Sequence, residues 1–112
     1  MAKKYIWPEW KSRAPGFHEV NFAQISNSQL THKAMRKLRG NAFKLYCYMD
    51  FIACGKRIFE LPIGEYSKFM DDNTFARALK ELIAAGFIEV HENNAHRKRS
   101  NKYRFSTRWK EH

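Results

Sequence analysis

The feature that most constrains this chain is an apolar stripe at helical spacing between Asn41 and Cys54. Apolar residues recur every three or four positions there, at Ala42, Leu45, Tyr46, Met49, Ile52 and Ala53. This spacing predicts a helix with one buried face. Gly55 follows, and glycine commonly ends a helix in a left-handed conformation. The chain is therefore expected to be built around a helix over residues 41–54 that other elements must cover.

Two further helices are predicted on either side of this one. A helix over residues 73–85 has an inward stripe of Phe75, Ala78, Leu79, Leu82 and Ile83. Asp71 is its expected N-cap and Gly86 its end, while Asp72 is expected to be solvated. A short helix over residues 28–38 has apolar side chains four positions apart, at Leu30, Ala34 and Leu38.

Strand signals complete the domain. Strands are predicted over residues 58–61, 87–91 and 102–106. Pro62 stops the first strand and is suited to start a short helix over residues 63–69. The other two strands flank a polar, basic loop over residues 93–101, so we expect a long β-hairpin.

The length of 112 residues, 44% of them hydrophobic, is sufficient for one core and too short for two. Residues 1–27 lack periodicity and contain Pro8, Pro15 and Gly16, which predicts an irregular N-terminal arm before a domain over residues 28–112. No apolar run reaches the ~20 residues of a membrane-spanning helix, and no apolar export signal follows Met1. We expect a soluble, cytoplasmic protein.

Charge is the first indication of function. The chain has 21 Lys and Arg against 11 Asp and Glu, a formal net charge of +10. Such a surplus favours a polyanionic partner, nucleic acid first and anionic membrane second. Residues 33–57 carry seven bases against one acid, residues 58–92 three against seven, and residues 93–110 seven against none. Membrane binding is the poorer interpretation, because no predicted helix combines a basic face with a deep apolar face.

Residue patterns typical of catalysis or metal binding are weak. Cys47 and Cys54 on one helix would lie ~10 Å apart along the axis, too far for a disulfide. There is no Cys-x-x-Cys pair for zinc, and the glycines are isolated rather than gathered in a phosphate loop. We expect a protein that is not an enzyme, with no catalytic residues, no cofactor and no metal.

The order helix, strand, short helix, longer helix and hairpin is that of a winged helix-turn-helix, an α+β fold that is mainly α. Residues 38–46 (LRGNAFKLY) resemble the first helix of the small winged helix-turn-helix proteins of phages, plasmids and conjugative elements. Residues 73–88 (NTFARALKELIAAGFI) resemble their recognition helix, and residues 101–106 (NKYRFS) their returning wing strand. The resemblance spans about residues 28–109. It implies DNA binding in replication initiation or transcription regulation on a mobile element.

Candidate contacts with double-stranded DNA follow from this arrangement, because a helix fits the major groove and a basic hairpin reaches the backbone or minor groove. In the helix they are Asn73, Thr74, Arg77 and Lys80; in the wing they are Arg97, Lys98, Arg99, Lys102 and Arg104. Arg77 is the best candidate for a guanine contact. The alternative for Arg77 is a pair with Glu81 one turn later. Lys33, Arg36 and Lys37 are further candidates for phosphate contacts, with a purely solvated surface as the alternative.

Three alternatives stay open. A second apolar line on the first long helix is either covered by the N-terminal arm or the short helix, which we favour, or forms a homodimer contact; it comprises Phe43, Cys47, Phe51 and Cys54. Tyr103 and Trp109 either pack in the domain, which we favour, or stack on single-stranded bases. Finally, the chain could be a protein-interaction module of a replication or conjugation complex, with the acidic residues 58–92 as the partner surface.

Overall fold

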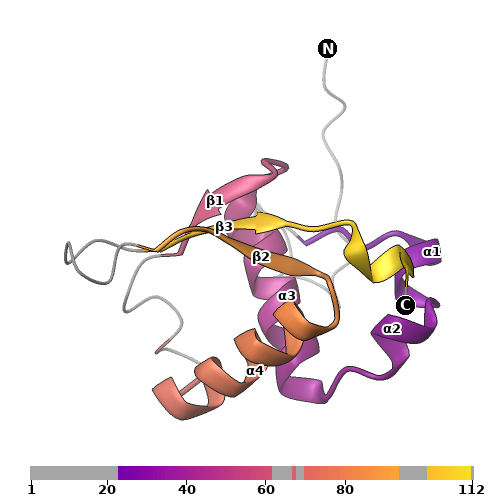
Figure 1. The fold of residues 1–112 in the computed structure, drawn as a ribbon, viewed down its shortest axis with the longest axis horizontal. Coiled ribbons are helices and arrows are strands. Elements are labelled where there is room, and N and C mark those ends of the chain that lie inside the picture. The colour runs from indigo at the N-terminus through magenta and orange to yellow at the C-terminus, as the bar shows by residue number, and fades with distance from the viewer. Residues whose placement is uncertain (1–22, 62–66, 68–69, 94–100, 112) are drawn as a thin grey trace, which may run out of the picture.

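Three short antiparallel strands and the two longest helices build the centre of the fold (Figure 1). The computed structural model describes residues 23–61, 67, 70–93 and 101–111. In chain order its elements are α1 (Asn27–Leu30), α2 (Lys33–Arg36), α3 (Gly40–Ala53), β1 (Ile58–Glu60), α4 (Asp72–Ala84), β2 (Ile88–Glu92), β3 (Lys102–Phe105) and the 3-10 helix η4 (Arg108–Glu111). The chain is thus an α+β protein with more helix than strand, as expected. Among the described residues, none of the helices combines the length and the apolar character needed to cross a bilayer.

The prediction of one helix over residues 28–38 is wrong, because side-chain caps divide this segment into α1 and α2. The hydroxyl of Thr31 donates to the carbonyl of Asn27 at 2.8 Å, where α1 ends. The next residue, His32, starts α2, and its Nδ1 accepts from the amide of Ala34 at 3.1 Å. Leu30, expected on the buried face, is 48% exposed, whereas Ala34 is buried.

The predicted central helix is confirmed as α3. Its buried residues are Ala42, Leu45, Tyr46, Met49 and Ala53, and Ile52 is half-buried. The helix ends one residue earlier than expected, because Cys54 already adopts a left-handed conformation, with φ of 50°. Gly55 continues the turn with φ of 84°. Two successive left-handed residues reverse the chain toward β1.

The second long helix, α4, also matches its prediction. The Oδ1 atom of Asp71 accepts from the amide of Thr74 at 2.7 Å, so Asp71 is the N-cap. Ala78 and Leu82 are buried, and the rest of the apolar stripe packs against the core. α4 lies against α3 and is followed directly by β2.

The strand order in the sheet is β1-β3-β2, with all neighbours antiparallel. Arg104 of β3 stands opposite Ile58 of β1 and Glu89 of β2, and a register shift follows Val90. The strands of the predicted hairpin are therefore confirmed. Three parts of the predictions lie outside the described residues: residues 94–100 of the loop predicted over residues 93–101, most of the helix predicted over residues 63–69, and residues 1–22 of the arm predicted over residues 1–27.

The helix η4 is an element that the sequence patterns did not predict. The ring of Trp109 in η4 stacks on Phe87 at 5.8 Å between centroids and 11° between planes, and His32 meets it edge-on at 5.1 Å. The amide of Trp109 donates to the carbonyl of Gly86 at 3.0 Å. Through these contacts η4 packs against the core and links the start of α2 to the residues just before β2.

Candidate nucleic-acid interface

Three of the four candidate DNA-binding residues of α4 share one exposed face. Asn73, Arg77 and Lys80 are all exposed and stand at helical spacings of four and three residues, so their side chains project from one side. Ala76 and Ala84 are also exposed, which leaves the helix surface beside these polar groups low and open. Thr74, the fourth candidate, is half-buried. The structure therefore brings together a row of hydrogen-bond donors on the exposed face of α4.

One of the two aspartates at the start of α4, Asp71, has a structural role as the helix cap. The pKa of Asp71 lies below its usual value, mainly because Thr74 donates hydrogen bonds to its carboxylate, and the positive charge of Arg77 lowers the pKa further. Asp71 is therefore ionised at neutral pH and stabilises the positive end of the helix. Asp72 lies in the first turn and is exposed, as expected.

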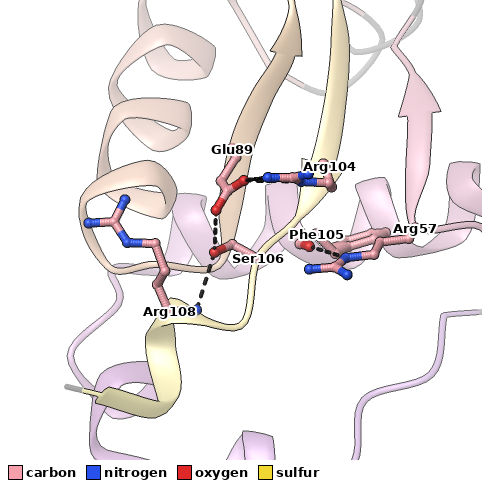
Figure 2. Close-up of polar contacts among 6 residues, drawn as sticks. All are labelled: Arg57, Glu89, Arg104, Phe105, Ser106 and Arg108. Atoms are coloured by element: carbon pink, nitrogen blue, oxygen red, sulfur yellow. Dashed lines mark hydrogen bonds and ion pairs between the residues drawn. The ribbon is translucent and has the colours of Figure 1, made fainter.

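The two wing candidates on β3 form ion pairs with acids of β2. The Nζ atom of Lys102 lies 3.6 Å from Oε2 of Glu92. The Nε atom of Arg104 donates to Oε2 of Glu89 at 3.0 Å, and a terminal nitrogen of the same guanidinium pairs with that oxygen (Figure 2). The sequence did not reveal these pairs, because they depend on the register of the two strands. The remaining wing candidates, Arg97, Lys98 and Arg99, lie outside the described residues.

Glu89 connects the two strands to the turn that precedes η4. Its Oε1 atom accepts from the hydroxyl of Ser106 at 2.9 Å, and that hydroxyl in turn accepts from the backbone amide of Arg108 at 3.2 Å (Figure 2). The hydrogen bond from Arg104, followed by the one from Ser106, lowers the pKa of Glu89 below its usual value. Its carboxylate form is thus the one that holds this end of the sheet together.

Protonation of Glu89 is expected to make the fold weaker in acid. Because the folded pKa is below the usual 4.5, the stabilisation is fully present above pH 4.5 and is lost as the pH falls through the folded pKa. Glu89→Gln should therefore lower the free energy of unfolding most at neutral pH, and its difference from the wild type should shrink in acid. Urea unfolding of both proteins between neutral pH and pH 3 measures this difference. A difference that is constant across the range would contradict the assigned role.

The alternative pairing of Arg77 with Glu81 is not what the structure shows. Glu81 instead binds Arg39, which precedes α3: its Oε2 accepts from the Arg39 amide at 2.9 Å, and its Oε1 lies 3.8 Å from the Arg39 Nε. No described acid lies within ion-pair distance of Arg77. Arg39 was missed by the sequence analysis, since it is 42 residues from its partner.

Much of the acidic segment is engaged within the chain. Four of its acids cap a helix or pair with a base, namely Asp71, Glu81, Glu89 and Glu92. These contacts neutralise part of the basic surplus on β3 and before α3. The acidic segment is therefore less available as a separate surface than its net charge indicates.

The remaining sequence candidates divide between core and surface. Tyr103 is buried and Trp109 is packed on Phe87, which confirms the packing interpretation for both. The bases on and after α2 are exposed, namely Lys33, Arg36 and Lys37.

The second apolar line of α3 is half-buried except for the exposed Cys54, and both Cys47 and Cys54 are free thiols. In the described ranges no three His, Cys, Asp or Glu side chains are grouped as metal ligands.

In comparisons with known proteins, the chain matches no protein family, no curated protein and no solved structure. The resemblance to winged helix-turn-helix proteins therefore remains a prediction from residue patterns. The class of the site is defined by its own chemistry, an exposed helix face with cationic and amide groups beside a small antiparallel sheet.

Proposed function

We propose that this chain is a winged-helix protein that binds double-stranded DNA, as a transcription regulator or replication-initiation factor of a mobile genetic element. The observation that carries the proposal is the exposed row of Asn73, Arg77 and Lys80 on α4. The order of elements and the sheet order β1-β3-β2 support it, since they put α4 directly before a β2–β3 hairpin. In this proposal α4 is the recognition helix and the hairpin is the wing.

The chemistry of the exposed row suits the major groove. The guanidinium of Arg77 can donate two hydrogen bonds to a guanine, and the amide of Asn73 can pair with an adenine edge. Lys80, one turn from Arg77, supplies a cation for a backbone phosphate. No described acid is paired with Arg77, so its donors are available to a base.

In the wing, the basic loop rather than the strand supplies the charge for DNA. Lys102 and Arg104 are offset by Glu92 and Glu89, so their pairs would have to be broken or shared in a complex. The sequence between the strands carries Arg97, Lys98 and Arg99 without an acid. These three bases are proposed as the main backbone contacts of the wing.

The alternative function, a protein-interaction module of a replication or conjugation complex, has less support. Its proposed partner surface was the acidic segment, and four acids of that segment already bind groups of this chain. A homodimer on a symmetric site remains compatible with the DNA-binding proposal.

Removing the three wing bases is expected to weaken DNA binding and flatten its salt dependence. Each phosphate contact contributes a slope of about −0.9 in log K against log salt, so Arg97→Ala/Lys98→Ala/Arg99→Ala should make the slope less negative by about 2 to 3. Fluorescence anisotropy with a labelled random duplex, titrated at several salt concentrations, measures both quantities.

The matched control removes three bases from the opposite end of the sheet. Lys56→Ala/Arg108→Ala/Lys110→Ala lowers the net charge equally at exposed positions near the end of β3 that is remote from the loop. Its slope should change much less. If the wild type does not bind at low salt, or if both triple variants behave alike, the proposed wing is wrong. The acidic segment should then be tested for protein partners.

A further inference from the structure

We propose that a pocket between the start of α3 and the middle of α4 binds one backbone phosphate of the DNA, with Arg39 as its cationic ligand and the nearby charge of Arg77 as a second attraction. This inference rests on the proposed function and deepens it. It adds a contact outside the recognition helix and the wing, from a residue that no sequence pattern indicated.

The pocket is a concave site of about 240 Å³. Side chains from two separate elements line it: Arg39, Asn41, Ala42, Thr74, Arg77, Ala78 and Glu81. Because Ala42 of α3 and Ala78 of α4 have short side chains, they leave space between the two helices for a small group. Arg39 and Arg77 come from opposite sides of this opening, one before α3 and the other on α4.

Glu81 positions Arg39 without burying its charge. The carboxylate holds the backbone amide of Arg39 at 2.9 Å, while the Arg39 side chain is 90% exposed and its Nε is 3.8 Å from the carboxylate. The guanidinium thus retains donors for a ligand, because it has five N–H groups and its contact with Glu81, at 3.8 Å, is longer than a hydrogen bond. With Arg77 and Glu81 the charge of the pocket is +1.

The uncharged lining also suits an oxyanion. Asn41 is exposed at the rim, and its side-chain amide offers two N–H donors. A tetrahedral phosphate takes hydrogen bonds from guanidinium and amide groups on several sides, and arginine can bind it through two parallel N–H groups. The Arg39 guanidinium and the Asn41 amide supply such donors, and the positive charge of Arg77 adds to the attraction.

The pocket is placed where a DNA strand would run beside α4. Arg77 belongs both to the exposed row of α4 and to the lining of the pocket. When a helix lies in the major groove, the sugar-phosphate strands form the two walls of that groove, so the flank of the helix faces phosphates. A phosphate held here would fix the depth and register of α4, since backbone contacts position a protein without reading sequence.

Arg39→Ala tests the cationic ligand of the pocket. Loss of one phosphate contact should make the salt slope less negative by about 0.9 and weaken binding about fivefold near physiological salt. Lys56→Ala is the matched control, because it removes one exposed base at the other end of α3. The readout is anisotropy of a labelled duplex, and circular dichroism checks that each variant is folded.

Glu81→Gln is expected to change DNA affinity in the opposite direction from Arg39→Ala. A carboxylate beside a bound phosphate is repulsive, so its replacement by the amide of the same shape should tighten DNA binding several-fold and steepen the salt slope. If Glu81 served only to brace Arg39, the amide would leave DNA binding equal or weaker. Unfolding in urea confirms that the variant used in the binding assay is folded.

The outcomes separate this inference from the proposed function. A wild type that does not bind duplex at low salt overturns both. A wild type whose binding depends on the wing bases supports the proposed function. If the wild type binds in this way, two results would overturn the phosphate pocket alone. One is an equal salt slope of DNA binding for Arg39→Ala and Lys56→Ala. The other is DNA binding by folded Glu81→Gln that is no tighter than that of the wild type.

Discussion

Replacing Gly86 with alanine is expected to destabilise the fold by about 2 to 5 kcal/mol, through backbone strain and a clash together. Gly86 has φ of 86°, a conformation that residues with a Cβ rarely adopt. An added Cβ would lie 2.6 Å from the backbone nitrogen of Trp109 and 2.7 Å from the carbonyl carbon of Arg108. These backbone atoms belong to η4, which is held to Gly86 by the hydrogen bond from Trp109. The clash therefore cannot be relieved by rotating a side chain.

Alanine substitutions at two other glycines distinguish the cost of backbone strain from the cost of the steric clash. Gly55 has φ of 84° but nothing within 4 Å of its Cβ position, so Gly55→Ala should cost only the strain, about 1 to 2 kcal/mol. Gly40 has neither feature, and Gly40→Ala in the first turn of α3 should change stability by less than about 1 kcal/mol. Urea unfolding followed by circular dichroism gives the three values. Equal losses at Gly86 and Gly55 would show that η4 does not pack as described.

Phe87→Ala is expected to lower the free energy of unfolding by about 3 to 5 kcal/mol, which is typical of a large aromatic removed from a core. Phe87 is fully buried. Its ring meets Tyr46 of α3 edge-on at 5.4 Å and stacks on Trp109 of η4 at 5.8 Å. The cavity would thus lie where the long helix, the sheet and the C-terminal segment meet, and both neighbouring rings would lose contacts.

A half-buried phenylalanine provides the comparison for this loss. Phe51 of α3 stacks on Tyr48 at 6.2 Å and is partly exposed, so Phe51→Ala should cost clearly less than Phe87→Ala. Phe87→Leu, which refills part of the space, should recover part of the loss. Chemical unfolding monitored by tryptophan fluorescence would also report the altered surroundings of Trp109. Equal costs for the two alanine variants would place Phe87 outside the core.

Local patterns were sufficient where an element depends on its own side chains. The stripe from Ala42 to Ala53 placed α3 to within a residue or two, and the cap of α4 by Asp71 involves a partner only three residues away. The same local approach failed at α1 and α2. The apolar spacing of Leu30 and Ala34 indicated one helix, but hydrogen bonds of Thr31 and His32 end one helix and begin another.

For the candidate site, helical periodicity was enough to put Asn73, Arg77 and Lys80 on one face, because that geometry follows from the helix alone. It did not indicate which bases are already paired. Arg104 meets Glu89 through the register of β2 and β3, and Arg39 meets Glu81 across 42 residues of sequence.

The sequence by itself determined the two long helices α3 and α4, the three strands and the exposed face of α4, because each rests on spacing within about one turn or one strand. Only the tertiary structure decided how the charges are divided, since a base and an acid far apart in the chain attract each other strongly only when folding brings them within a few ångströms. It also decided the role of Gly86 and η4: close packing of backbone on backbone leaves no periodic signal, yet it determines where a Cβ can fit.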